Sequence, residues 1–101
     1  MEEVQQITDS KAANEIFIGK KPLMAYVTAA LVRLTDGSAV TIKARGRAIT
    51  AAVDVVQIMI KRMDNLGYKV EGIKLGSEQM QSQDGRTRNV STIEIEVSRE
   101  K

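Results

Sequence analysis

The segment from Arg47 to Leu66 constrains the fold most, because its apolar residues spread around more of a helix than one buried face requires. At about 100° per residue the apolar arc covers roughly 220°, whereas a helix packed on one sheet needs about half that width. The arc contains Ile49, Ala52, Val53, Val55, Val56, Ile58, Met59, Ile60, Met63 and Leu66. Either a second helix on the same face of a sheet covers the surplus, or a second subunit does. We expect a homodimer, with Ile60, Met63 and Leu66 as candidates for contacts within or between dimers.

The rest of the chain has the pattern of one more helix, from Pro22 to about Thr35 and closed by Asp36-Gly37, and of four strands. The strands are residues 15–18, 38–44, 69–75 and 90–97. The first of them is largely apolar, which predicts a central strand covered on its faces. The order β-α-β-α-β-β predicts one compact α/β domain, an α+β sandwich of two layers.

Residues 76–89 separate the last two strands and contain one large apolar side chain, Met80. Asp84-Gly85 lies near their centre and is a strong signal for a tight turn. The segment is either a disordered loop or an extended two-stranded arm. Matching lengths on the two sides of Asp84-Gly85 favour an arm, which would project by roughly 20 Å because it has too few apolar groups to pack on the core.

Domain organisation is simple. Residues 1–13 are polar and without periodicity, which predicts a flexible N-terminal tail, and residues 14–101 are expected to form a single domain. The chain has no cysteine, no secretion signal and no run of about 18 apolar residues. We therefore expect a cytoplasmic protein with no membrane partner.

Composition disfavours catalysis. Histidine and cysteine are absent, which removes the usual general base, the usual metal ligands and the thiol nucleophile. Glu94 and Glu96 alternate on the outward face of a strand and Asp54 lies on a polar helix stripe, so each is expected to be solvated. Residues 19–22, Gly-Lys-Lys-Pro, lack the frame of a nucleotide-binding loop. We expect no enzyme activity, no cofactor and no metal site.

Cations are gathered in three clusters although the net charge is only +2. The clusters are Lys20 and Lys21, then Lys43, Arg45 and Arg47, and then Arg86 and Arg88. Lys20-Lys21 and Arg45-Arg47 each follow the end of a strand and precede a helix, so a right-handed strand–helix–strand unit brings them to the same edge of the sheet. Arginines on a thin two-stranded arm suit a DNA groove or a line of phosphates. One cluster alone would indicate a solvated loop, but three together predict a nucleic-acid-binding surface.

Several segments of this pattern resemble the Alba family of archaeal chromatin proteins, over about residues 15–97. They read Ile18-Gly19-Lys20-Lys21-Pro22-x-Met24-x-Tyr26-Val27, Ile42-Lys43-Ala44-Arg45-Gly46-Arg47-Ala48-Ile49-x-x-Ala52-Val53-Asp54, Asp84-Gly85-Arg86 and Val90-Ser91-x-Ile93-Glu94-Ile95. The resemblance implies a small dimeric protein that binds double-stranded DNA, and also RNA, with little sequence preference. It also implies a fold like the C-terminal domain of bacterial translation initiation factor three.

The resemblance implies roles for the clustered cations as well. Lys20 and Lys21 would contact the nucleic-acid backbone at the centre of the dimer, and Lys20 matches the lysine whose acetylation weakens binding in the family. Arg45 and Arg47 would extend that surface, and the two arginines of the arm would reach neighbouring minor grooves. An acetyltransferase and a deacetylase are then expected partners, and the chromosome is the expected location.

Two departures from the family pattern stand out. Ala25 occupies a position where the family often has asparagine, and Met63 one where it commonly has phenylalanine. In the family, the position of Met63 helps dimers stack side by side along DNA, so it stays open whether dimers of this chain stack. It also stays open whether the chain is a divergent paralogue that forms a heterodimer with a standard family member. Three functions are in competition: an architectural DNA-binding protein, an RNA-binding subunit of a ribonucleoprotein or an RNA-stabilising protein, and a protein-interaction or enzyme module whose basic surface is incidental.

Overall fold

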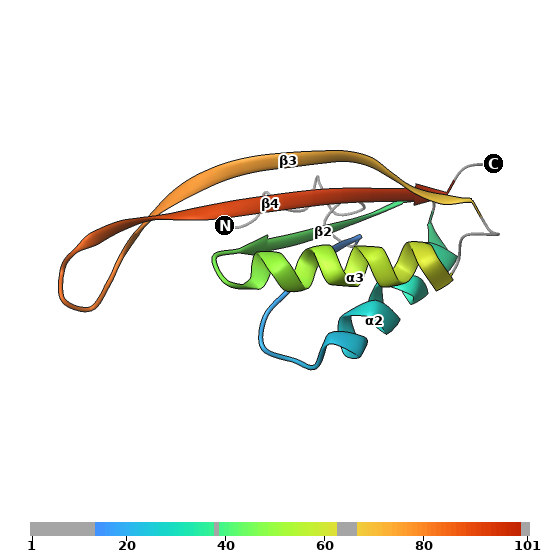
Figure 1. Ribbon diagram of the computed structural model, residues 1–101, viewed down its shortest axis with the longest axis horizontal. Coiled ribbons are helices and arrows are strands. Elements are labelled where there is room, and N and C mark those ends of the chain that lie inside the picture. The colour runs from blue at the N-terminus through green and yellow to red at the C-terminus, as the bar shows by residue number, and fades with distance from the viewer. Residues whose placement is uncertain (1–13, 38, 63–66, 100–101) are drawn as a thin grey trace.

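The computed structural model describes residues 14–37, 39–62 and 67–99 of the 101-residue chain (Figure 1). Its elements follow the predicted order β-α-β-α-β-β. They are β1 (Glu15–Phe17), α2 (Leu23–Asp36), β2 (Ala39–Arg45), α3 (Ala48–Arg62), β3 (Tyr68–Gln81) and β4 (Thr87–Arg99). The tail expected at residues 1–13 lies outside the described residues, so its flexibility stays a prediction.

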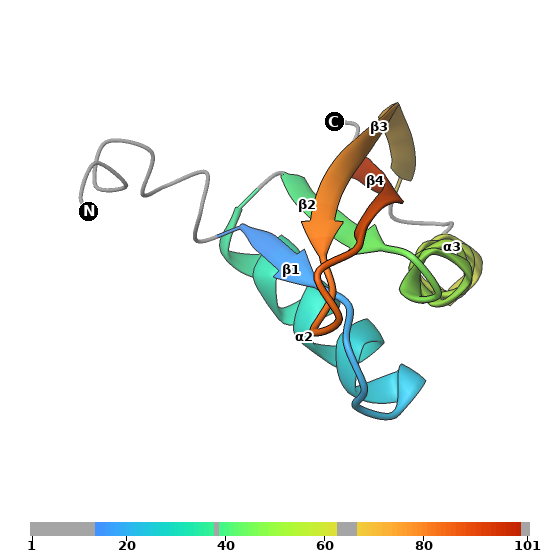
Figure 2. The same cartoon turned by 90° about the vertical axis from the view of Figure 1, so that its left-hand side faces the viewer.

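The four strands form one mixed sheet in the order β1-β2-β4-β3. β1 runs parallel to β2, and the other neighbouring pairs are antiparallel. Figures 1 and 2 show both helices on one face of this sheet, which leaves the opposite face without a helix. The arrangement is a two-layer α+β sandwich, as predicted.

The inner face of the sheet and the two helices share one aliphatic core. Buried residues of the strands alternate with outward-facing ones on β2 and β4, as the sequence predicts. The core consists of Ile16, Ile18, Tyr26, Val27, Ala30, Leu34, Val40, Ile42, Ala44, Ala52, Val55, Val56, Met59, Tyr68, Ile93, Ile95 and Val97. α2 and α3 contact each other as well as the sheet. Both helices thus share one face of the sheet, which is the first of the two arrangements considered for the wide apolar arc, but Val53 remains 40% exposed and the homodimer stays a prediction.

β1 is an edge strand, so the prediction of a central strand is wrong. Among the described strands it pairs with β2 alone, with Ile16 opposite Ile42 and Phe17 opposite Lys43. Ile16 faces the helices and is buried, whereas Phe17 faces away from them and is 67% exposed. The apolar run was misleading because an aromatic residue occupies an outward position where a polar residue is the usual choice.

Residues 76–89 form a two-stranded arm, so the alternative of a disordered loop is wrong. β3 continues to Gln81 and β4 begins at Thr87, and the two strands are paired continuously from Gly72 opposite Glu96 to Gln81 opposite Thr87. The outer half of this hairpin extends beyond the helices and the other strands (Figure 1). Its side chains are exposed, because no second layer faces them there.

Glycines follow both helices, with different backbone geometry. Gly37 caps α2 in an extended conformation, and its N–H donates to the Arg33 carbonyl at 3.1 Å. Gly67 has a φ of +81°, in the left-handed region that glycine adopts most easily. The predicted last turn of the second helix, at residues 63–66, lies outside the described residues. In the part of the chain that is described, neither helix has the length and apolarity needed to cross a membrane.

Val40→Ala should lower the free energy of unfolding by about 2 kcal/mol, because it removes two methyl groups from a side chain that is 1% exposed. Val32→Ala is a matched control on α2, where the same side chain is 56% exposed, and should change that free energy by no more than about 0.5 kcal/mol. Urea denaturation at one protein concentration measures both. Equal losses in the two variants would contradict the assignment of the core.

Candidate nucleic-acid interface

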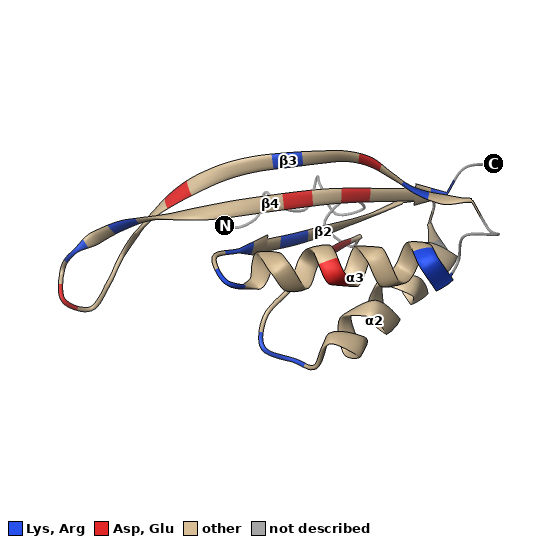
Figure 3. Ribbon diagram, viewed as in Figure 1, with Lys and Arg blue, Asp and Glu red and all other residues tan. Residues whose placement is uncertain are grey.

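The turns that follow β1 and β2 leave the sheet at the same end, where the carboxyl ends of these two strands lie. Phe17 pairs with Lys43, and the Ile18 N–H donates to the Lys43 carbonyl at 2.9 Å, so the two parallel strands end together. Figure 3 shows the basic residues of both turns at this end of the molecule. We call the exposed cations of this region the basic edge. They are Lys20, Lys21, Arg45 and Arg47.

A buried tyrosine fixes the first of these turns. The hydroxyl oxygen of Tyr26 accepts hydrogen bonds from the backbone N–H groups of Gly19, at 2.8 Å, and of Lys21, at 3.0 Å. Tyr26 belongs to the core, so its ring is held by packing. A Cβ at position 19 would lie 3.3 Å from the hydroxyl oxygen, and glycine leaves room for the contact. The turn that presents Lys20 and Lys21 is therefore anchored to α2.

The second turn depends on the glycine between its two arginines. Gly46 has a φ of +59°, a conformation that side chains disfavour. Its N–H donates to the Ser91 carbonyl at 2.9 Å, and its carbonyl accepts the Ile49 N–H at 3.1 Å. These bonds tie the turn to β4 and to the start of α3. Arg45 therefore lies at the end of a strand, whereas Arg47 directly precedes a helix.

One acidic residue pairs with a cation of the basic edge, and the other three cations have no acidic partner among the described residues. Arg45 Nη1 lies 3.3 Å from Glu78 Oε1 on β3, in an exposed pair that stabilises the fold little. Among residues 14–37, 39–62 and 67–99, no ion pair engages Lys20, Lys21 or Arg47. These three cations keep their charge available for an anion.

Lys43 differs from the other members of its cluster. Its Nζ lies 3.4 Å from a Glu15 oxygen and 3.8 Å from a Glu94 oxygen, and its side chain is only 23% exposed. The same Nζ lies 5.1 Å from the centroid of the Phe17 ring. The structure places Lys43 on the outer face of the sheet, beside the basic edge, and its contact with nucleic acid stays a prediction.

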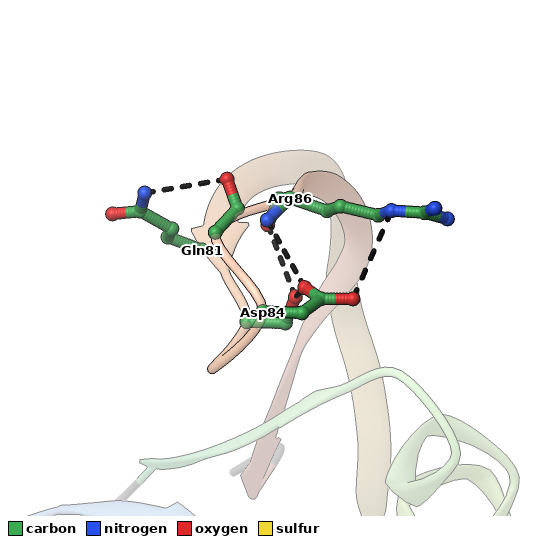
Figure 4. A network of polar contacts seen from close by, with 5 residues as sticks. Gln81, Asp84 and Arg86 are labelled. Atoms are coloured by element: carbon green, nitrogen blue, oxygen red, sulfur yellow. Dashed lines mark hydrogen bonds and ion pairs between the residues drawn. The ribbon is translucent and has the colours of Figure 1, made fainter.

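The third cluster lies at the end of the arm, where hydrogen bonds close the turn at residues 82–86 (Figure 4). The Ser82 hydroxyl donates to Asp84, whose carboxylate also accepts the Arg86 N–H at 3.0 Å. The Ser82 N–H donates to the Arg86 carbonyl at 2.8 Å. Gly85, with a φ of +86°, completes the turn. Arg86 is therefore held in the turn, and Arg88 lies close to it on β4, opposite Met80. Figure 3 shows basic residues at this end of the arm, beyond those of the two turns.

An ionised acid accompanies these arginines. The hydrogen bond from the Ser82 hydroxyl and, after it, the backbone N–H of Arg86 hold the pKa of Asp84 below its ordinary value. Asp84 is therefore charged at neutral pH, and its carboxylate lies 3.8 Å from Arg86 Nε. It offsets part of the charge of Arg86. Arg88 has no such partner in the part of the chain that is described.

The structure describes the predicted assembly residues only in part. Ile60 is half-buried on α3 and packs against the core. Met63 and Leu66 lie outside the described residues. Contacts of these three residues within or between dimers stay a prediction.

A different apolar surface lies along β3, where the sequence did not indicate one. Val70, Ile73 and Leu75 pair with the inward-facing residues of β4, so they face the helix layer. Even so, Ile73 is 61% exposed and Leu75 is 75% exposed, because β3 is the second edge strand and α3 leaves much of it uncovered (Figure 2). We call Val70, Ile73 and Leu75 the β3 apolar surface.

Sequence reasoning missed two polar contributors to the basic edge. Tyr26 was noted only as part of a family motif, because no general pattern links a helical tyrosine to N–H groups five and seven residues before it. Glu78 is 33 residues from Arg45, and only the register of β3 on β4 brings the two together. A sequence signal for the Arg45–Glu78 contact would require knowledge of the strand pairing.

Known proteins have a similar fold and a related sequence. A family model described as Alba matches residues 14–77. A Nitrosopumilus maritimus protein named DNA/RNA-binding protein Alba is 60% identical over 90 residues, which cover 89% of this chain and 95% of that protein. The structure of Alba from Thermoplasma volcanium matches with a TM-score of 0.78 and 42% identity, over 85% of this chain and all of that chain. The structure of ALBA1 from Trypanosoma brucei matches with a TM-score of 0.65 and 30% identity, over 85% of this chain and 68% of that chain. The resemblance seen in the sequence is confirmed, and the chain belongs to the Alba family.

Proposed function

We propose that this chain is a non-enzymatic, architectural protein that binds double-stranded DNA, and also RNA, with little sequence preference. The observation that carries the proposal is the basic edge, whose cations come from two separate turns and are brought together by the pairing of β1 with β2. The Nitrosopumilus maritimus relative is named for both nucleic acids, which supports the same proposal.

The chemistry of the basic edge suits phosphates rather than base edges. Lysine and arginine side chains that neutralise phosphates release counterions, and this term acts on every sequence alike. The exposed residues of α2 include Met24, Ala25, Thr28 and Val32, which offer few of the hydrogen-bonding groups that read bases in a major groove. Affinity without strong sequence preference follows from this distribution.

The arm extends the proposed contact along the duplex. Arg86 and Arg88 lie at or beside its tip, and a thin ribbon with arginines can follow a groove or a line of phosphates. Asp84 weakens the contribution of Arg86, and two carboxylates weaken that of Lys43. We therefore expect Arg88 to contribute most on the arm and Lys43 least of the seven candidate cations.

We also propose a homodimer, which doubles the basic edge. The β3 apolar surface supports it, because exposed Ile73 and Leu75 side chains gain free energy when a second copy removes them from water. Contacts through Ile60, Met63 and Leu66, and a heterodimer with a paralogue, are further arrangements of the same kind. The proposed location is the chromosome in the cytoplasm.

Acetylation of Lys20 is a proposed means of regulation. The Lys20 side chain is exposed and has no ion pair among the described residues, so a modifying acetyltransferase or deacetylase could reach it. Acetylation would remove one charge from the basic edge and weaken phosphate binding.

An RNA-binding subunit of a ribonucleoprotein is the second candidate function, and the name of the Nitrosopumilus maritimus relative favours keeping it. The same cations serve either duplex, because both present lines of phosphates. Crosslinking in cells, followed by sequencing of the bound DNA and RNA, separates the two functions. Recovery of one nucleic acid alone would assign the main partner.

Arg45→Ala combined with Arg47→Ala should weaken duplex binding for all sequences alike and reduce the slope of log affinity against log salt by about two, because two phosphate contacts are lost. The matched control is Lys61→Ala combined with Arg62→Ala, which removes the same charge from exposed positions at the other end of α3. Salt-titrated fluorescence anisotropy measures both variants. An unchanged slope in the first variant, or a loss confined to one sequence, would contradict the proposed surface.

Tyr26→Phe should lower duplex affinity by about fivefold while the fold is kept, since it removes only the oxygen that accepts two backbone hydrogen bonds. Hydrogen exchange followed by NMR should show faster exchange at the Gly19 and Lys21 amides. Tyr68→Phe is the control, because this buried tyrosine makes no hydroxyl hydrogen bond within the described residues. The anchoring role of Tyr26 is refuted if both amides exchange as in the parent protein.

Leu75→Asp should convert the proposed dimer to a monomer, because it places a charge in the β3 apolar surface. Val32→Asp, on the exposed face of α2, should leave the assembly unchanged. Light scattering at micromolar concentration measures the molar mass. A monomeric parent protein, or a dimeric Leu75→Asp variant, would refute this surface as the interface.

A further inference from the structure

The face of the sheet opposite the helices carries a single aromatic ring. Phe17 points to this outer face and is 67% exposed, whereas the other two aromatic residues of the chain, Tyr26 and Tyr68, are buried in the core. No helix covers this face in the described part of the chain (Figure 2). The ring therefore presents an apolar, planar surface to solvent beside the basic edge.

The surroundings of Phe17 are polar and charged. Lys43 Nζ lies 5.1 Å from the ring centroid, and Glu15 and Glu94 hold that ammonium group on either side of its strand. Arg45 is the next outward-facing residue of β2 after Lys43, and it belongs to the basic edge. The Phe17 ring thus lies beside the ammonium group of Lys43 and close to the basic edge.

A hollow of about 510 Å³ opens next to the ring. Its polar lining consists of Lys43, Arg45, Glu78, Thr92 and Glu94, from β2, β3 and β4. On β3 the cross-strand neighbour of Thr92 is Gly76, where a Cβ would lie 2.9 Å from the threonine hydroxyl oxygen. Since glycine has no side chain, no atoms of residue 76 project from the outer face of the sheet into the hollow. The volume is in the range of sites that hold small planar ligands.

The chemistry of this hollow selects one kind of ligand. An aromatic ring on an open sheet face offers a stacking partner for a flat heterocycle. Glu78 and Glu94 offer acceptors for exocyclic amino groups, and they repel phosphates from the middle of the face. Phosphates are instead favoured at the basic edge, where Arg45 joins both regions. An unpaired nucleobase attached to a phosphate backbone meets all three conditions, whereas the bases of a duplex are stacked in pairs and cannot reach the ring.

We propose that the outer face of the sheet is a separate binding site for single-stranded nucleic acid, in which an unpaired base stacks on Phe17 and enters the hollow while its phosphates lie along the basic edge. The site goes beyond the proposed duplex binding. The two functions share Arg45 but not Phe17, so substitutions of Phe17 separate them.

Phe17→Ala should lower the affinity for a single-stranded oligocytidylate of about ten nucleotides by about tenfold, and should leave the affinity for a duplex of the same length unchanged. Phe17→Leu is the matched variant, because it keeps an apolar side chain on β1 but removes the aromatic ring. It should lose single-strand affinity as Phe17→Ala does, and Phe17→Tyr should retain it. Anisotropy at one salt concentration measures all variants, and thermal denaturation confirms that each is folded.

Phe17→Trp provides a direct readout, because the chain has no other tryptophan. Stacking of a base should quench its fluorescence when oligocytidylate binds, while an abasic oligonucleotide of equal length and the duplex should leave the emission unchanged. This measurement does not depend on how much stability the alanine variant loses.

Three outcomes of the affinity measurements would overturn the proposal. They are unchanged single-strand affinity in the alanine and leucine variants, equal loss of single-strand and duplex affinity in both, and retained affinity in Phe17→Leu alone, which would indicate an apolar contact without stacking. Tryptophan emission that does not respond to saturating oligocytidylate would also overturn it. Failure of duplex binding itself would instead count against the proposed function, because Phe17 takes no part in that surface.

Discussion

The parallel pairing of β1 with β2 is the interaction on which the candidate site depends. β1 contributes only Glu15–Phe17 to it, at the edge of the sheet. The strand is held by this ladder and by Ile16 and Ile18, which are buried under the helices. If β1 separated from β2, the two basic turns would no longer share an edge, although every cation would still be present. The proposed affinity for a polyanion is thus tied to the burial of two isoleucines, which carry no charge themselves.

The surface has one region where cations are paired with carboxylates and another where cations have no acidic neighbour among the described residues. On the outer face of the sheet, Lys43 is paired with two carboxylates, and Lys69 lies 3.7 Å from Glu71. At the end of the sheet, Lys20, Lys21 and Arg47 have no acid beside them among the described residues. This contrast explains how a chain with a net charge of only +2 can present a strongly basic surface.

The order of the elements, the alternation on β2 and β4 and the positions of the basic turns could be predicted, because each depends on local periodicity or on short spacings. The place of β1 in the sheet could not be predicted, since a short apolar run fits an edge strand as well as a central strand when Phe17 faces outward. The Arg45–Glu78 pair and the exposure of Ile73 and Leu75 could not be predicted either, because they depend on which strand is last in the sheet. Tertiary arrangement, rather than local sequence, decides all three.

The strand register of the β3–β4 hairpin in the core determines how far its tip lies from the basic edge. Its pairing begins with Tyr68 opposite Arg99 beneath α3 and, after one irregularity between Val70 and Gly72, continues to the tip without a break. β4 is also paired with β2, and a slip of β4 by one residue against β2 would turn Ile93, Ile95 and Val97 from the core to solvent, so the core forbids it. The distance between the basic edge and the arginines of the arm is therefore set by aliphatic residues far from either. Shortening the arm by a matched pair of residues would change the spacing of the two contacts while leaving the core intact.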